Sequence, residues 1–296
     1  MSLLAPTRSE NPLRDLIDRY CLEDLVAAGG MASIYRATDT KTGTRVAIKI
    51  PHAQKLRDPF TLDRLRHEIE IGTKLDHPGL AKILPNSDAG HRYVVMEWID
   101  GRLLRELMNH DGPLPSERAI RIALEICDVV EYMHRSGVVH GDLKPENVMV
   151  NATGNVKVID FGIAREMKRS FWKRSRPEEA TGTPDYVSPE QIQGKRGDAR
   201  GDIYSLGVML FEMLTGEVPF SGLDPALAMN LRAMADPPLV GEINSDISPK
   251  LQAVVHRALA RDRSKRFASA CGLASHLSEL LAEESEVRRL ESFAHV

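Results

Sequence analysis

The chain has 296 residues, of which 42% are hydrophobic and 27% are charged, and its formal net charge is −3 at pH 7. This composition suffices for one large domain or two lobes with a real core, and it excludes an overall basic field that would bind nucleic acid or an anionic membrane. No run approaches eighteen consecutive apolar residues, so no membrane-spanning segment is predicted.

The N-terminus and the cysteines indicate the compartment. Met1 to Tyr20 lacks the apolar core of a signal peptide. Cys21, Cys127 and Cys271 have no metal-ligand spacing, and each lies in an apolar or helical context that favours a buried free thiol. We therefore expect a protein of the reducing cytoplasm.

Residues 1–19 precede the first clear strand. Leu13, Leu16, Ile17 and Tyr20 recur at helical spacing, which is compatible with a short amphipathic helix. A loosely held terminal turn is an equally good interpretation.

From Tyr20 the pattern becomes that of β-structure, with strands predicted over 20–28 and 33–38. The turn between them reads Ala27-Ala28-Gly29-Gly30-Met31-Ala32. A glycine-rich hairpin can bring backbone N–H groups close to phosphates, because the side chains that would block the approach are missing. Alone, this turn is a weak signal, and a plain hairpin turn is the alternative.

The next predicted elements are a strand over 45–50, a helix from Pro59 to Leu75, and two further strands over 80–84 and 92–99. Together the strands form an antiparallel sheet. The last of them turns polar at Asp100-Gly101, where the periodicity changes to that of helices.

The second part of the chain is predicted to be helical, apart from strand pairs over 148–150 and 156–159. Helices are expected over 103–109 and from Ser116, as N-cap, to just before Gly137. A helix over 202–214 is apolar on all sides and should be buried. Three more helices follow at 225–235, 249–260 with Ser248 as N-cap, and 270–281 with Ser269 as N-cap, before a charged tail from Glu283 that would fray or lead into a linker.

One stretch carries most of the chemistry. His140-Gly141-Asp142-Leu143-Lys144-Pro145-Glu146-Asn147 is followed thirteen residues later by Asp160-Phe161-Gly162. It places a carboxylate, an ammonium and an amide in one loop, with a second carboxylate at the end of a strand pair. Phosphoryl transfer from a metal nucleotide needs a hydroxyl acceptor, a cation and oxygen ligands for magnesium. A lone loop aspartate is usually a turn residue, but four suitable residue types in order argue against coincidence.

This order of motifs, with Val46-Ala47-Ile48-Lys49 before it, resembles the Hanks-type serine/threonine protein kinases, from residue 20 to about 281. The resemblance implies a two-lobed α+β fold, in which a small antiparallel sheet with one helix precedes a larger helical lobe. The implied divisions are an extension 1–19, an N-lobe 20–96, a hinge 97–100, a C-lobe 101–281 and a tail 282–296. The Gly-Gly-Met turn suggests a bacterial source.

The resemblance also implies the catalytic roles. Asp142 would accept or orient the substrate hydroxyl, Lys144 would steady the γ-phosphate, and Thr183 would bond to both. The magnesium ions, or manganese in their place, would be bound by Asn147 and Asp160. Phosphates of ATP would contact Lys49, and the helix glutamate that holds this lysine is Glu68, favoured over Glu70 by its distance from the end of the helix.

The nucleotide site implied by the resemblance lies beneath the glycine-rich turn and against the hinge. Met96 would stand at the back of the adenine pocket, and the backbones of Glu97 and Ile99 would bond the adenine edge. Ordinary core packing is compatible with these roles. The implied ATP-binding residues are Val26, Ala27, Ala28, Gly29, Gly30, Ile34, Ala47, Lys49, Met96, Glu97, Ile99 and Met149.

Other residues have implied structural or regulatory roles. Asp202 would anchor the backbone of the catalytic loop, and Glu190 would pair with Arg266. The segment 160–190 is strongly basic, which is typical of a solvated loop; alternatively it attracts acidic substrate or phosphate. Ser170, Ser175 and Thr181 are the candidate phosphorylation sites within it.

The sequence departs from the family pattern at three positions. Ala27 and Ala32 replace glycines, and Gly141 replaces the arginine that usually receives an activation-loop phosphate. We therefore expect activity to depend weakly on phosphorylation of that loop.

The expected partners are ATP and unidentified protein substrates, with self-association for autophosphorylation; no nucleic acid is expected. The same three departures support an alternative, a pseudokinase that binds nucleotide and signals through contacts. A dinucleotide-binding oxidoreductase is disfavoured, because a strand rather than a helix follows the glycines.

Overall fold

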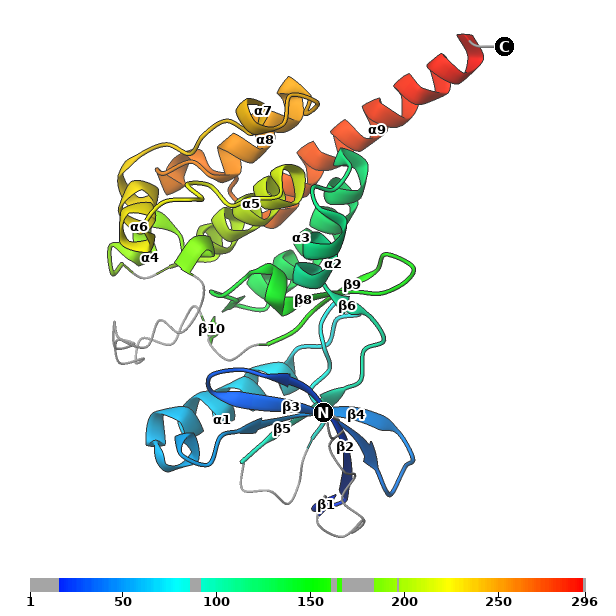
Figure 1. The fold of residues 1–296 in the computed structure, drawn as a ribbon, viewed down its shortest axis with the longest axis vertical. Coiled ribbons are helices and arrows are strands. Elements are labelled where there is room, and N and C mark those ends of the chain that lie inside the picture. Colours follow the sequence, from blue (N-terminus) through cyan, green and yellow to red (C-terminus); the bar gives the residue numbers. More distant parts are fainter. Residues whose placement is uncertain (1–15, 86–91, 161–163, 167–183, 196, 295–296) are drawn as a thin grey trace, which may run out of the picture. The chain divides into compact units, whose positions relative to one another are not determined.

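The computed structural model describes residues 16–85, 92–160, 164–166, 184–195 and 197–294. The chain forms two compact units, one from Met1–Lys74 and Lys82–Trp98, the other from Leu75–Ala81 and Ile99–Val296. Figure 1 shows β1 to β4 of the first unit in blue and the helices of the second unit in green to red. Among the described residues, no helix is both long enough and apolar enough to cross a membrane.

The first unit is built on a five-stranded sheet in which neighbours along the chain pair antiparallel, in the order β1-β2-β3-β4-β5. Alternating side chains of these strands fill one core, which includes Tyr20, Ile48 and Val95. The strands are β1 Leu16–Ile17, β2 Tyr20–Ala28, β3 Ala32–Asp39, β4 Arg45–Pro51 and β5 Val94–Glu97.

One main helix completes this unit. A short 3-10 turn, η1 (Lys55–Arg57), leads into α1 (Pro59–Lys74), which buries Leu65 and Ile71. The helix was predicted to within one residue, and the small sheet unit with one helix is confirmed.

Two predictions for this unit were wrong. Leu16 and Ile17 pair with Cys21 and Tyr20 in a hairpin, so the helical interpretation fails there. Tyr20 is only 1% exposed, and its burial in the sheet core explains the extended backbone. Residues 80–84 form isolated bridges rather than a strand, because the chain passes from the second unit to the first within them.

The second unit is helical around two small sheets. β6 (Arg102–Leu103), β8 (Val148–Val150) and β9 (Val156–Val158) form one sheet, and β7 (Val138–Val139) pairs with β10 (Arg165–Glu166) in the other. Its helices are α2 Leu104–Asp111, α3 Ser116–Arg135, α4 Pro189–Ile192, α5 Ala199–Thr215, α6 Pro225–Met234, α7 Val240–Ile243, α8 Pro249–Ala258 and α9 Ala270–Ala294, with 3-10 turns η2 Pro145–Asn147, η4 Pro184–Tyr186 and η5 Arg263–Lys265.

Helix α5 is the centre of this unit. Every residue from Gly201 to Thr215 is buried, as its all-round apolar sequence predicted. A Cβ on Gly207 would lie 2.9 Å from the Cβ of Ala258 on α8, so glycine is what lets the two helices approach this closely.

Three further predictions needed correction. The N-cap of α3 is Pro115 rather than Ser116, because the Pro115 carbonyl already accepts the first helical bond, from Ala119. Helix α9 continues to Ala294 instead of ending near 281, since the charged tail from Glu283 contains no glycine or proline that would stop it.

The third correction concerns the thiols. Cys127 is buried, and burial raises the pKa of its thiol to about 12. Cys21 is only half-buried and Cys271 is exposed, so the expectation of buried thiols was wrong for both. Cys271 lies in the first turn of α9, where a helix in an apolar context still has an outer face.

Candidate active site

The first unit pairs a strand lysine with a helix glutamate. Lys49 Nζ lies 2.9 Å from Oε1 and 3.1 Å from Oε2 of Glu68. Glu68 is 3% exposed and its carboxylate holds the lysine from inside α1. Glu70, the other candidate, instead bonds Lys74 on the helix surface at 3.0 Å. The structure therefore brings Lys49 to Glu68, and fixes an ammonium at a defined place on β4.

The glycine-rich turn forms one hydrogen bond within itself and two with His52. Gly29 N–H donates to the carbonyl of Ala32 at 2.9 Å, so this N–H is used within the hairpin. The His52 N–H donates to Met31 O at 3.0 Å, and its ring Nε2 lies 2.7 Å from Gly29 O. Since a carbonyl oxygen only accepts, the ring carries a proton on Nε2. Val26, Ala27, Ala28 and Gly30 of this hairpin are exposed.

The remaining residues implied for nucleotide belong to both units. In the first, Ala47 is buried, whereas Ile34 and Met96 are half-buried. The Glu97 N–H donates to Lys82 O at 2.9 Å, so the carbonyl of Glu97 is the group that could accept from adenine. In the second, Ile99 and Met149 are half-buried.

The catalytic loop brings three predicted side chains together. Lys144 Nζ lies 2.7 Å from Oδ2 of Asp142. Asn147 donates its amide to the Asp142 carbonyl at 2.8 Å and to Oδ2 at 3.3 Å. The 3-10 turn η2 supplies this geometry by ending at Asn147. A carboxylate is thus held between a cation and an amide, while the carbonyl end of Asn147 can accept.

Asp160 follows β9 with a φ of 67°, in the left-handed region that residues with a Cβ rarely adopt. Its carboxylate and the Asn147 carbonyl are hard oxygen donors of the kind that magnesium prefers, and magnesium is commonly held by one or two carboxylates plus substrate phosphates. The donor set therefore fits Mg²⁺. Among the described residues, no group of three or more histidines, cysteines or carboxylates could hold a metal ion.

Asp202 fastens the start of the catalytic loop. Its carboxylate accepts from His140 N–H at 2.9 Å, from Gly141 N–H at 2.8 Å and from His134 Nε2 at 2.7 Å, and it is only 1% exposed. Burial acts to raise the pKa of Asp202, but the bond from His134, the two histidines and the Gly141 N–H outweigh it, so the pKa lies below its ordinary value. The carboxylate is therefore kept charged inside the protein.

Gly141 has a φ of 77°, a conformation that costs an L-residue about 1–2 kcal/mol. Glycine at this position therefore has two effects: the loop avoids this backbone strain, and it lacks the arginine of the family pattern.

Glu190 and Arg266 form a buried bidentate pair. Both N–O distances are 2.8 Å, and Arg266 also donates to Arg200 O at 2.9 Å. Burial acts to raise the pKa of Glu190, but the bonds and charge of Arg266 prevail and hold it below its ordinary value. The pair ties α4 to the η5 region.

Several predicted residues lie outside the described part of the chain: Thr183, Ser170, Ser175 and Thr181. Sequence reasoning missed another group, Arg105 with Glu212 and Tyr186, which contacts the catalytic loop through Glu146. One signal pointed to it, because Glu212 is a carboxylate inside a helix predicted to be wholly buried, and a buried charge needs a partner.

Comparisons with known proteins agree with this geometry. Residues 20–278 match the family model described as "Protein kinase domain". The chain is 38% identical over 267 residues to serine/threonine-protein kinase PknB of Mycobacterium leprae, covering 88% of this chain and 43% of that protein. It is 38% identical over 266 residues to a probable serine/threonine-protein kinase of Streptomyces coelicolor, covering 88% and 39%.

A probable serine/threonine-protein kinase of Corynebacterium efficiens is 35% identical over 290 residues, covering 95% of this chain and 44% of that protein. The chain therefore spans well under half the length of the curated relatives it matches.

Proposed function

We propose, from the premise that this chain belongs to the protein kinase domain family and to its bacterial Hanks-type serine/threonine branch, that it transfers the γ-phosphoryl group of MgATP to serine or threonine hydroxyls of proteins. The observation that carries the proposal is the cluster of Asp142, Lys144 and Asn147 in one loop. The loose transition state of phosphoryl transfer needs positioned charges rather than covalent chemistry.

Each side chain has a task that its contacts suit. Asp142 accepts or orients the substrate hydroxyl, because its carboxylate is held in place by the lysine and the amide. Lys144 stabilises the charge on the transferred group. Lys49, fixed by Glu68, binds the non-transferred phosphates of ATP. Thr183, by resemblance, supports the two catalytic-loop side chains.

Asn147 and Asp160 would hold Mg²⁺, which supplies neutralisation of phosphate charge when bound. The amide bonds from Asn147 to Asp142 orient its carbonyl for this purpose. Among the described residues, Asp202 and the Glu190–Arg266 pair act structurally, by fastening the loop and the following helix.

The replacement of arginine by Gly141 supports a second element of the proposal, weak dependence on activation-loop phosphorylation. Gly141 contributes backbone bonds alone: its N–H donates to Asp202, and its carbonyl accepts from Gln191 at 3.5 Å. No side chain at this position can receive a phosphate. A rise in activity of two or more orders of magnitude on phosphorylation of the dephosphorylated enzyme would contradict this.

We further propose that the protein acts in the cytoplasm, where ATP is supplied and its free thiols stay reduced. Autophosphorylation at Ser170, Ser175 or Thr181, through transient self-association, is part of the same proposal. It is supported by the many basic residues of segment 160–190.

The decisive experiment is intact-mass spectrometry of purified protein incubated with MgATP, alone and with a generic protein substrate. Wild type should gain phosphoryl groups or transfer them, whereas Asp142→Asn and Lys49→Met should not. Lys41→Met, at an exposed lysine in the β3–β4 turn, is the matched control and should behave as wild type.

The pseudokinase alternative is favoured by Ala27, Ala32 and Gly141, and by the Gly29 N–H that already bonds within its turn. Thermal-shift titration with MgATP separates the two functions. Nucleotide binding without transfer to any substrate would favour the scaffold, and absence of both would identify the altered turn as the defect.

A further inference from the structure

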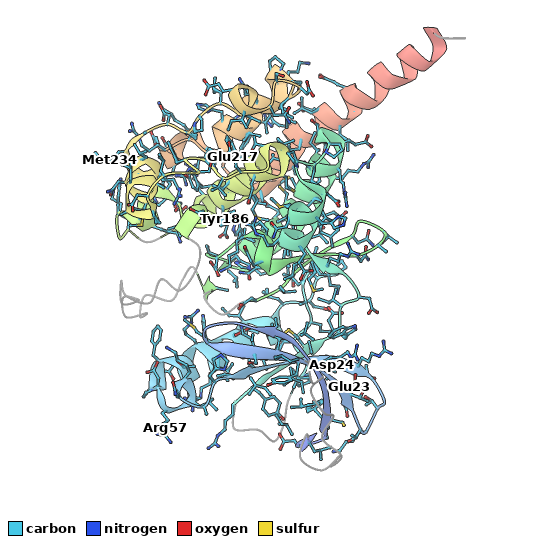
Figure 2. The ribbon with its side chains drawn as sticks, viewed as in Figure 1. Glu23, Asp24, Arg57, Tyr186, Glu217 and Met234 are labelled. Atoms are coloured by element: carbon cyan, nitrogen blue, oxygen red, sulfur yellow. The ribbon has the colours of Figure 1, made fainter. Side chains whose placement is uncertain are left out.

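Arg105 joins three elements of the second unit through one guanidinium group. Its Nε donates to Glu146 Oε1 at 2.8 Å and its Nη1 to Glu212 Oε1 at 2.6 Å. Its Nη2 bonds the hydroxyl of Tyr186, which in turn donates to Glu212. Tyr186, labelled in Figure 2, ends η4 next to α4, and Glu212 lies on α5. The cation on α2 is therefore shared by the catalytic loop, the η4 turn and the central helix.

The local fold explains why Arg105 reaches the catalytic loop. β6 pairs antiparallel with β8, with Leu103 opposite Met149. Arg105 follows the end of β6, and Glu146 precedes the start of β8, so the two residues lie just beyond the same end of the ladder. Glu146 stands between Lys144 and Asn147 in sequence, so a bond to Glu146 acts on the segment that carries both.

The charges of this group make Arg105 hard to replace. One cation serves two carboxylates, and Glu212 is only 5% exposed. The other oxygen of Glu146, Oε2, is buried and has no hydrogen-bond partner within the described residues. Burial raises the pKa of Tyr186, with Glu212 adding to the shift, so its hydroxyl stays protonated and donates. Without Arg105, both carboxylates would lose the cation that compensates them.

We propose that Arg105 is a positioning residue for phosphoryl transfer: by bonding Glu146 together with Glu212 and Tyr186, it sets the conformation of the loop that carries Asp142, Lys144 and Asn147. The planar fork of the guanidinium is required, since Nε and the two Nη atoms bond three separate partners, whereas a lysine carries all its donors on one nitrogen at the end of a shorter chain. The expected effect on kcat rests on the proposed function, whereas the expected effect on the conformation of the loop rests on the contacts alone.

The kinetic test compares Arg105→Lys and Arg105→Met with the same changes at Arg121, an exposed arginine of α3 whose bonds go to Glu117 one turn away. At a temperature where all variants are folded, Arg105→Met should lower kcat about 10- to 100-fold, the effect of a small misplacement of reacting groups. The KM for MgATP should stay unchanged. The kcat of Arg105→Lys should lie between those of Arg105→Met and wild type, and both Arg121 variants should match wild type in kcat.

The structural test is hydrogen exchange of the peptide covering residues 139–149, followed by mass spectrometry in the same variants. Exchange should be faster in Arg105→Met than in wild type or Arg121→Met, while peptides from α5 remain equally protected. Glu146→Gln, which keeps the shape of the side chain but removes its charge, should reproduce part of the change even where Arg105→Met folds poorly.

The outcomes separate this inference from the proposed function. A wild type that transfers no phosphoryl group would refute the proposed function. Hydrogen exchange of peptide 139–149 in the Arg105 variants would still show whether Arg105 positions the loop. Unchanged exchange in Arg105→Met, a kcat equal to wild type, or losses that merely follow the unfolded fraction across all peptides would overturn the inference and leave Arg105 as a stabilising residue only.

Discussion

Two loops of this protein are predicted to meet the phosphates, and they are held in opposite ways. The turn around Gly29 is exposed, and His52 holds it by two bonds, one to Gly29 and one to the half-buried Met31. The loop 140–147 is held by the buried carboxylate of Asp202, and by the half-buried Arg105, which bonds both Glu146 and the buried Glu212.

The difference follows from the physics of each task. A charged group that must stay in one place needs partners that water cannot replace, and buried bonds supply them. A turn that bonds phosphates through its backbone needs little support from side chains, and glycine lets it come close. We therefore expect substitutions to differ in kind: in kcat for the catalytic loop, in stability for the residues that anchor it, and in KM for MgATP for the glycine turn.

The largest effect is expected at the catalytic carboxylate. Asp142→Asn keeps the shape and the amide contacts but removes the charge that orients the hydroxyl, so kcat should fall about 10²- to 10⁴-fold. Thermal unfolding should change little, because Asp142 is only half-buried. Steady-state transfer to a generic protein substrate measures the first, and calorimetry the second. Retained activity would remove Asp142 from the mechanism.

The next effect tests the anchor beneath the same loop. Asp202→Asn leaves His134 and two backbone N–H groups facing an amide with a single acceptor oxygen, and a buried donor left without an acceptor costs about 1–3 kcal/mol. Urea unfolding should show this loss. Asp198→Asn is the control, since the half-buried Asp198 caps α5 and asparagine caps as well as aspartate, while the surface pair with Arg263 that it loses contributes little. An equal loss in the two variants would mean that the loop anchor has no special role.

The pH dependence of stability sharpens the comparison further. The pKa of Glu190 lies below its ordinary value in the folded state, so its pairing with Arg266 contributes fully above about pH 4.5, the ordinary pKa of a glutamate side chain. This contribution is lost as the pH falls through the folded pKa. The stability difference between wild type and Glu190→Gln should therefore be constant at neutral pH and shrink in acid. Unfolding free energies measured across this range would show whether it does.

The sequence predicted most of the elements and the order of the motifs, because periodicity and turn residues are local signals. Helix α1 and β8 were placed almost to the residue for this reason. The family and the fold class followed from motifs such as Val46 to Lys49. What could not be predicted depends on contacts between distant segments: the hairpin at Leu16 depends on the burial of Tyr20, and the end of α9 has no strong stop signal.

The site residues also divide into those that the sequence could predict and those that it could not. Residue types at fixed spacing pointed to Asp142 and Asn147, because their chemistry is contained in one loop. Arg105 and His52 carry no motif, and their roles arise from partners 41 and 23 residues away in the sequence. Only the fold reveals which of the many surface-like polar residues are bonded to the loops that matter.

The smallest predicted effect belongs to the glycine turn. His52→Ala removes the ring bond to Gly29 but leaves the backbone bond to Met31, so the turn loses one of two ties. A partly exposed hydrogen bond contributes about 1 kcal/mol, which corresponds to roughly a 5-fold rise in KM for MgATP. The value of kcat should not change, since the catalytic loop keeps all its partners.

His110→Ala is the matched control, because that exposed histidine bonds Asp111 on the surface of α2. His52→Gln offers an amide donor in place of the ring N–H and should recover part of the loss. A fall in kcat in His52→Ala with KM unchanged would show that the turn takes part in the chemistry itself, and the distinction between a loop that binds and a loop that reacts would not hold for this protein.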